Sequence, residues 1–264
     1  RAPTIATGLA TSRPDLSVWV VTGDGDALSI GGNHLIHALR RNVNLKILLF
    51  NNRIYGLTKG QYSPTSEVGK VTKSTPMGSV DHPFNPVSLA LGAEATFVGR
   101  ALDSDRKGLT EVLGAAAAHR GTALVEIFQD CPIFNDGSFD LLRKPETKDQ
   151  RLIAVRDGEP IIFGPENNRY AVVQDGLRLT VVPAEGATPV VHDASNHELA
   201  FALSRLSDQD LTHTVTGIFR NVDRTTYDDA ARAQVQPAKD AAAAKNPTTD
   251  LHALLNGRDT WTIT

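Results

Sequence analysis

Short, almost wholly apolar runs alternate with helix-type patterns through the first half of the chain. Four runs predict buried strands: 17–22, 45–50, 96–98 and 122–128. Apolar positions three and four residues apart predict helices in three further segments: 30–41, 86–91 and 108–119. Apolar strands that alternate with helices are typical of a parallel sheet covered on both faces. The pattern therefore predicts a doubly wound, mostly parallel α/β fold.

The pattern changes near residue 150, and we predict an α/β domain over 1–150 and a C-terminal extension over 151–264 packed on it. Further elements are predicted in the extension: strands at 160–163, 170–174, 177–182 and 214–219, and a helix at 196–206. The Ala-rich stretch 229–245 predicts a linker or a short exposed helix.

Composition narrows the class of protein. The net charge of -3 and the pI near 6.3 give no reason to expect nucleic acid as a partner. No apolar run approaches the roughly 20 residues of a membrane span, so no membrane is expected. Cys131 is the single cysteine, which excludes an internal disulfide and predicts a reducing cytoplasm. The chain starts at Arg1 inside a predicted amphipathic helix, as a segment of a longer protein would.

Polar residues follow two successive predicted strands. Gly23-Asp24-Gly25 follows the first, and Asn51-Asn52 follows the next. Gly-Asp-Gly alone is a common turn. The Asn51-Asn52 motif changes this interpretation, because the carboxyl ends of parallel strands lie at the same edge of the sheet. Aspartate and asparagine oxygens there, with the Ile54 carbonyl, suit Mg²⁺ held against a phosphate.

The glycines allow the main chain to approach a diphosphate, and a helix starting soon after Asp26 would offer its positive end. Other phosphate motifs fit worse. Leu28 stands where a dinucleotide fingerprint needs its third glycine, and where an EF-hand needs an oxygen ligand.

Gly-Asp-Gly followed by Asn-Asn at this separation resembles the thiamine diphosphate motif. Three segments, 23–34, 51–61 and 82–87, are similar to the β subunits of 2-oxoacid:ferredoxin oxidoreductases, and the likeness extends to about Asp140. The resemblance implies the thiamine diphosphate-binding fold, with Mg²⁺ held by Asp24, the Asn52 side chain and the Ile54 carbonyl. It implies that the cofactor is bound by Gly23, Asp24, Gly25, Asp26, Asn52, Ile54, Gly56, Leu57 and Thr58.

Cys131 takes its meaning from the same resemblance. A lone cysteine is usually a small apolar residue without a special role. In this family a cysteine at the matching position is the last of four ligands to a [4Fe-4S] cluster. The other three belong to a segment upstream of the position of Arg1.

The remaining candidates concern the substrate. By family position, Leu57 with Lys59 nearby favours 2-oxoglutarate or a broad range of 2-oxo acids over pyruvate. Lys59 could pair with a distal carboxylate, although a solvated loop lysine is an equal alternative. His34 and His37 are interpreted as packing or surface residues.

The resemblance implies oxidative decarboxylation to an acyl-coenzyme A, with electrons passed through the cluster to ferredoxin. It also implies a partner α subunit that carries the cofactor-activating glutamate, so this chain should be inactive alone. Two alternatives stay open: a thiamine-dependent decarboxylase or synthase without a cluster, and a non-catalytic α/β subunit in which Gly-Asp-Gly is only a turn.

Overall fold

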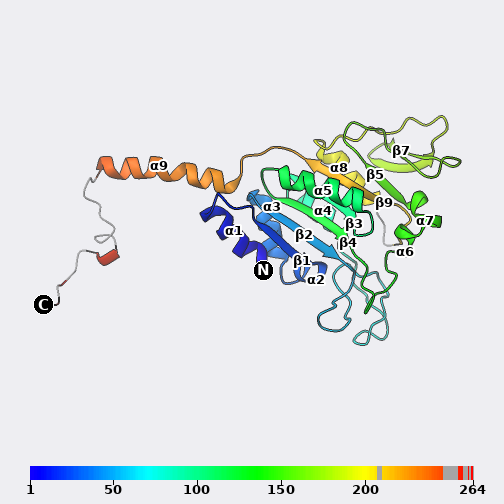
Figure 1. Ribbon diagram of the computed structural model, residues 1–264, viewed down its shortest axis with the longest axis horizontal. Helices are drawn as coiled ribbons and strands as arrows, with labels where there is room; N and C mark the ends of the chain where they lie inside the picture. Colours follow the sequence, from blue (N-terminus) through cyan, green and yellow to red (C-terminus); the bar gives the residue numbers. More distant parts are fainter. Residues whose placement is uncertain (207–209, 246–254, 258–260, 262, 264) are drawn as a thin grey trace.

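The computed structural model describes residues 1–206, 210–245, 255–257, 261 and 263. Its centre is a six-stranded sheet with the strand order β1-β2-β4-β3-β9-β5 (Figure 1). The strands are β1 (Trp19–Gly23), β2 (Lys46–Asn51), β3 (Phe97–Leu102), β4 (Ala123–Phe128), β5 (Leu152–Val155) and β9 (Thr214–Asn221). The first four run parallel, β9 runs antiparallel to β3, and β5 runs parallel to β9. The predicted mostly parallel α/β fold is confirmed.

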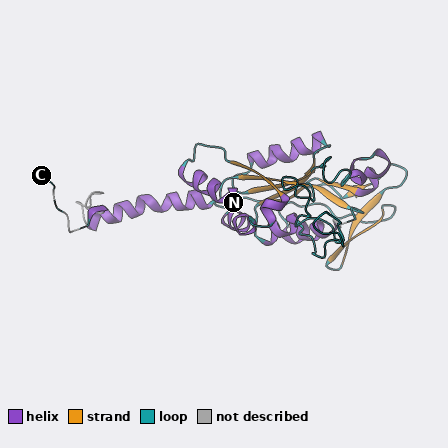
Figure 2. Ribbon diagram, turned by 90° about the horizontal axis from the view of Figure 1, so that it is seen from below, coloured by secondary structure: helices purple, strands orange, loops and turns teal. Residues whose placement is uncertain are grey.

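Helices cover both faces of this sheet, which Figure 2 shows close to edge-on. One core includes residues of five helices: α1 (Ala2–Ser12), α2 (Asp24–Leu28), α3 (Gly32–Arg41), α4 (Pro86–Gly92) and α8 (His197–Leu206). The opposite core is built on α5 (Arg106–Ala118). Neighbouring residues of β4 divide between them, since Leu124 lies in the first core and Val125 in the second. Burial on both sides explains why β3 and β4 are nearly all apolar.

Capping residues set where two of these helices begin. The Asn85 side chain accepts a hydrogen bond from the Ser88 amide at 3.1 Å, and Pro86 occupies the first turn of α4. The Asp105 carboxylate accepts from the Gly108 amide at the start of α5, also at 3.1 Å. The start of α4 faces the carboxyl ends of the strands, where the candidate site lies.

The predicted helix over 30–41 begins two residues later than expected. A short helix, α2 (Asp24–Leu28), starts at the Gly-Asp-Gly motif itself, and α3 follows from Gly32. Ile30 lies in the turn between them and is exposed rather than packed on the helix. The turn needs Gly31, because a Cβ there would lie 2.3 Å from the Asp26 carbonyl oxygen.

The second half contributes to the main sheet and forms a smaller one. Both β5 and β9 extend the six-stranded sheet, while β6 (Ile162–Phe163), β7 (Tyr170–Asp175) and β8 (Arg178–Pro183) form an antiparallel three-stranded sheet. Two short helices, α6 (Asp140–Arg143) and α7 (Pro145–Arg151), precede β5. The extension is therefore joined to the first 150 residues by strand pairing as well as by side-chain packing.

The stretch predicted as a linker or short helix is the long helix α9 (Tyr227–Lys245). It projects away from the body in Figure 1. Its first turn is tied down by ion pairs from Arg120 to Asp229 and from Arg232 to Asp228. The correction has a simple cause, since alanine has the highest helix propensity of all residues. No helix among the described residues has the length and apolarity that membrane crossing requires.

Candidate active site

The candidate site lies at the carboxyl ends of β1, β2 and β4, beside the long loop that follows β2 (Figure 1). Asp24 is the first residue of α2, directly after β1. Asn51 ends β2, and Asn52 follows it. Gly23 pairs with Phe50 in the parallel register, so the two half-motifs are neighbours, as the sequence predicted.

Two hydroxyl groups hold the buried carboxylate of Asp24, which is 2% exposed. The Ser63 hydroxyl donates to Oδ2 at 2.5 Å, and the Thr65 hydroxyl lies 2.6 Å from the same oxygen. Burial raises the pKa of Asp24, and the hydrogen bonds from Ser63, Thr65 and the Asn52 main chain act in the opposite direction. The group is thus a desolvated carboxyl whose anionic form depends on its neighbours.

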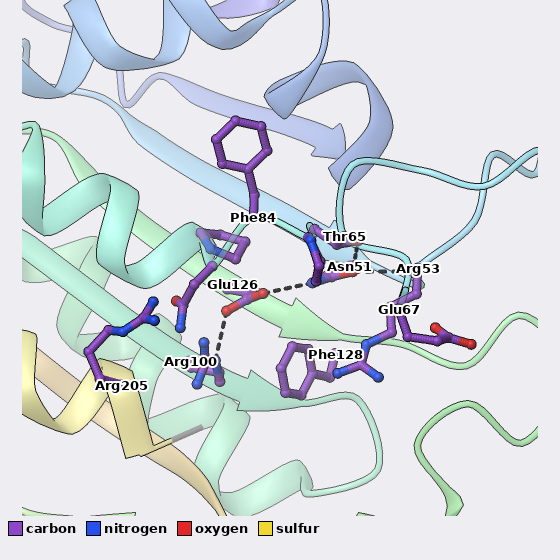
Figure 3. Close-up of a pocket in the computed structure, with 12 residues that line it drawn as sticks. Asn51, Arg53, Thr65, Glu67, Phe84, Arg100, Glu126, Phe128 and Arg205 are labelled. Atoms are coloured by element: carbon purple, nitrogen blue, oxygen red, sulfur yellow. Dashed lines mark hydrogen bonds and ion pairs between the residues drawn. The ribbon is translucent and has the colours of Figure 1, made fainter. Parts of the chain in front are cut away.

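A network of polar side chains leads from this carboxylate into the sheet, and Figure 3 draws its members Thr65, Asn51, Glu126 and Arg100. The Thr65 hydroxyl lies 2.8 Å from Asn51 Oδ1, and Asn51 Nδ2 donates to Glu126 Oε1 at 2.8 Å. Glu126 Oε2 accepts from Arg100 Nε at 2.7 Å, with both side chains at most 2% exposed. Buried charges persist where their partners are in place, because an unpaired ion in the core is costly. This network of hydrogen-bonded side chains therefore fixes the position of Asn51.

The segment after Asn52 is seated on α2 through Tyr55. The Tyr55 hydroxyl donates to the Gly25 carbonyl at 3.1 Å. A Cβ on Gly25 would lie 2.2 Å from a carbon of the Tyr55 ring, so only glycine allows this approach. The Ile54 amide donates to Asn52 Oδ1 at 3.2 Å, and the Ile54 side chain is buried. This is why the motif needs its second glycine.

Asp26 and residues 57–59 do not belong to the buried group around Asp24. Asp26, Leu57, Thr58 and Lys59 are all exposed, and Leu57 is 98% exposed. Lys59 adopts a left-handed backbone with φ 76. Gly56 is half-buried beside them. The structure thus brings Asp24, Asn52 and Ile54 together and places Leu57 and Lys59 on an open surface.

Cys131 lies half-buried in a turn after β4 and is a free thiol. The Asn135 amide of that turn donates to the Cys131 carbonyl at 2.9 Å. The Asn135 side chain donates to the Asn52 carbonyl, also at 2.9 Å. Phe134 packs on Gly60 in the loop after β2. The cysteine therefore sits in a turn attached to the segment that carries Asn52.

A cavity of about 300 Å³ opens beside Asn51 on the side of α4 and α8 (Figure 3). Its lining combines arginines, carboxylates and aromatic rings, namely Arg53, Arg100, Arg205, Glu67, Glu126, Phe84 and Phe128, with Asn51, Thr65 and the turn Pro83–Pro86. Arg53 has a left-handed backbone with φ 56, and its guanidinium lies 5.1 Å from the centre of the Phe139 ring.

Five residues of the site were not singled out in the sequence: Asn51 as a buried network member, Ser63, Thr65, Arg100 and Glu126. A signal existed for the last two, because each is a charged residue inside an otherwise apolar strand. They stand directly opposite each other in the β3–β4 register. The hydroxyls of 63–66 carried no such signal, because a Ser-Pro-Thr-Ser run is also typical of an ordinary loop.

The donor set can be tested against the implied cofactors. A carboxylate, an amide oxygen and a main-chain carbonyl are oxygen ligands that suit Mg²⁺ with phosphate oxygens completing its shell. Asp24 offers its carboxylate at the start of α2, and Asn52 and Ile54 offer their oxygens in the segment after β2, so these residues fit the ion. The described residues hold no group of three histidine, cysteine or acidic side chains arranged for a metal. Cys131 alone does not hold an iron–sulfur cluster.

Comparison with known proteins places this geometry in a family. Residues 1–127 match the model for the thiamine pyrophosphate enzyme, C-terminal TPP binding domain. The chain is 72% identical to the 2-oxoglutarate oxidoreductase subunit KorB of Mycobacterium tuberculosis, across 100% of this chain and 71% of the relative. It is 41% identical to the 2-oxoacid:ferredoxin oxidoreductase subunit beta of Sulfolobus sp, across 63% of this chain and 54% of that protein.

A solved structure agrees. The 2-oxoglutarate:ferredoxin oxidoreductase of Magnetococcus marinus, with 2-oxoglutarate, coenzyme A and succinyl-CoA bound, superposes with a TM-score of 0.69 at 31% identity. The match covers 93% of this chain and 73% of the solved one. A family of enzyme subunits fits better than the non-catalytic alternative. The chain belongs to the family of β subunits of 2-oxoglutarate and other 2-oxoacid:ferredoxin oxidoreductases, enzymes that act on 2-oxo acids.

Proposed function

We propose that the chain binds Mg²⁺ and thiamine diphosphate through Asp24, the Asn52 side chain and the Ile54 carbonyl. The observation that carries the proposal is the buried Asp24 carboxylate, which adjoins the Asn52 segment at the carboxyl ends of β1 and β2. Gly23 leaves open space beside the main chain, whereas the Tyr55 ring packs on Gly25. The match of residues 1–127 to a thiamine pyrophosphate-binding domain supports the same cofactor.

The proposed reaction is oxidative decarboxylation of a 2-oxo acid, with 2-oxoglutarate as the preferred substrate. Thiamine diphosphate, when bound, supplies the carbon nucleophile and the electron sink that loss of CO₂ requires. This chain would bind and orient the cofactor, and coenzyme A would take the acyl group. Support for 2-oxoglutarate comes from the M. tuberculosis relative and from the M. marinus structure, which has 2-oxoglutarate and coenzyme A bound.

Cys131 is proposed as one thiolate ligand of a [4Fe-4S] cluster that passes electrons to ferredoxin. Three further ligands are needed, and they would come from outside these 264 residues. The position of Cys131 supports the proposal, since its turn is hydrogen-bonded to the Asn52 main chain and thus adjoins the proposed cofactor site. A cytoplasmic location belongs to the same proposal, because cysteine ligands must stay reduced.

An α subunit is proposed as the partner that completes the active site. Leu57 and Lys59 support this, because an exposed leucine and lysine beside the proposed cofactor residues suit a surface shared with a second chain and the substrate. In that complex Lys59 would pair with the distal carboxylate of 2-oxoglutarate. The proposal assigns no general acid or base to this chain.

Binding of the cofactor tests the proposal directly. The full-length subunit with its α partner is freed of metal and titrated calorimetrically with thiamine diphosphate, with and without Mg²⁺. We expect saturable binding that requires Mg²⁺ and is lost in Asp24→Asn. Asp149→Asn is the control, since Asp149 is an exposed carboxylate on α7, which carries none of the proposed cofactor residues. Binding that is indifferent to Mg²⁺, or unchanged in Asp24→Asn, would overturn the proposed site.

A further inference from the structure

The two hydroxyl groups that contact the Asp24 carboxylate belong to residues about 40 positions after the Gly-Asp-Gly motif. Ser63 and Thr65 lie in the loop after β2, and both side chains are at most 4% exposed. Both hydroxyls approach Oδ2 of Asp24, at 2.5 and 2.6 Å. The Thr65 hydroxyl has a single hydrogen and lies between two acceptors, Asp24 Oδ2 and Asn51 Oδ1. Both loop hydroxyls therefore lie on the Oδ2 side of the Asp24 carboxylate.

Thr65 also links this carboxylate to the sheet. Its hydroxyl lies 2.8 Å from Asn51 Oδ1. The orientation of the Asn51 amide is determined by Glu126, because a carboxylate paired with Arg100 can only accept hydrogen bonds. Asn51 must therefore turn its NH₂ group to Glu126 and its oxygen to Thr65. The position of Thr65 is thus set by a buried ion pair on two central strands.

We infer that Ser63 and Thr65 are positioning residues for the proposed Mg²⁺ site, with Thr65 carrying the fixed position of Asn51 over to Asp24. This rests on the proposed function. The two adjacent asparagines then have different tasks. Asn52 offers an oxygen to the ion, whereas Asn51 acts through Thr65 and does not contact the ion. The loop after β2 therefore supplies both hydroxyls that contact the Asp24 carboxylate.

A purely structural role for the loop hydroxyls is the competing explanation. The same loop contains a matched control, because the Thr72 and Thr75 hydroxyls lie 2.6 Å from each other and are not bonded to Asp24. Removal of the Thr72 hydroxyl should disturb the loop as a deleted side-chain hydrogen bond does. It should leave the carboxylate of Asp24 untouched. The two threonines therefore separate loop stability from cation binding.

The test is the dissociation constant of Mg²⁺, measured by calorimetry at saturating thiamine diphosphate on the full-length subunit with its partner. Thr65→Val should weaken Mg²⁺ binding roughly tenfold, which is the effect of losing one hydrogen bond to a charged group. Thr65→Ser should restore affinity to within about twofold of the original, because the hydroxyl returns. Ser63→Ala should weaken binding by a similar factor, and Thr72→Val should leave it unchanged.

Equal weakening by Thr65→Val and Thr65→Ser would overturn the inference, and so would equal weakening by Thr72→Val. If Thr65→Val does not fold, the comparison of Ser63→Ala with Thr72→Val decides in the same way. Different results would refute the positioning role and the proposed function. Absence of Mg²⁺-dependent cofactor binding in the unmodified protein refutes both. Normal binding that Ser63→Ala and Thr65→Val leave unchanged refutes the positioning role alone.

Discussion

Asn51 and Glu126 are hydrogen-bonded to each other across the two parallel strands β2 and β4, with Asn51 Nδ2 donating to Glu126 Oε1 at 2.8 Å. Both side chains are buried. Glu126 is held in turn by Arg100, which also contacts the Val215 carbonyl on β9 at 3.3 Å. A strand of the second half of the chain thereby supports the residues beside the candidate site.

Breaking the Arg100–Glu126 pair is expected to destabilise the fold strongly. Arg100→Met leaves an unpaired carboxylate in the core and should lower the free energy of unfolding by about 3–5 kcal/mol. Arg100→Met combined with Glu126→Leu should recover much of that loss, because no buried charge remains. Urea unfolding of the single and double variants measures both values. A double variant no more stable than Arg100→Met would contradict this account.

The close packing of Gly25 and Tyr55 predicts opposite effects for two glycine substitutions. Gly25→Ala places a Cβ 2.2 Å from the Tyr55 ring. It should lower the free energy of unfolding by about 1–3 kcal/mol, as overpacking does. Gly114→Ala is the control, because Gly114 lies in α5 with open space around its Cα. It should stabilise the helix by up to about 1 kcal/mol. Thermal unfolding would refute the packing argument if both variants shifted the same way.

Lys46 predicts a rise in stability at alkaline pH. Its ammonium group is buried and donates to the His119 and Gly121 carbonyls. Burial is the largest influence and lowers the pKa of Lys46 from 10.5 to about 8. Between these pH values the unfolded chain binds more protons than the folded one, so stability increases with pH. Below about pH 8 both states are protonated, and this contribution is constant.

The expected slope is on the order of 1 kcal/mol per pH unit at most. Urea unfolding at pH 7.5 and 9.5, conditions chosen on either side of the shifted value, measures it. Lys46→Met removes the titrating group, so its stability should change less over this interval than that of the unmodified protein. Parallel changes in the two proteins would show that Lys46 does not titrate there.

Lys59 predicts a change in substrate preference without a change in fold. Lys59→Met should raise the KM for 2-oxoglutarate roughly tenfold, the effect of a lost charge-assisted hydrogen bond. It should leave the KM for pyruvate nearly unchanged, because pyruvate has no distal carboxylate. Lys73→Met is the control, since Lys73 is an exposed lysine of the same loop. Equal effects on both substrates would contradict the proposed pairing of Lys59 with the distal carboxylate.

The fold was largely predictable because the strands of the main sheet are mostly apolar and most of the helices follow a regular periodicity. The contact between the Gly-Asp-Gly and Asn-Asn motifs was predictable as well, since strands of one parallel sheet end at the same edge. The loop donors Ser63 and Thr65 were not, because hydrogen bonds across about 40 residues leave no periodic trace in the sequence. Pairing of β9 with β3 was missed for a similar reason, since strand pairing at long range depends on tertiary packing.

The length of α9 was not predicted from the sequence, for a different reason. Its Ala-rich sequence has strong helix propensity, but few apolar positions that would mark a buried face. The spacing of apolar residues therefore did not predict this helix, although the helix propensity of alanine did. The polar anchors at its start, Arg120 to Asp229 and Arg232 to Asp228, join residues far apart in the chain or on one turn. Neither kind of contact could be assigned before the fold was known.

The central claim is tested most directly by turnover. The full-length subunit and its α partner are purified without oxygen, and 2-oxoglutarate-dependent reduction of a viologen dye is followed with and without coenzyme A. The account predicts coenzyme A-dependent reduction with one thiamine diphosphate and one four-iron cluster per αβ pair. Asp24→Asn should abolish the activity, and Cys131→Ser should remove the iron. Thiamine diphosphate without iron, or dye reduction that persists in Asp24→Asn, would contradict it.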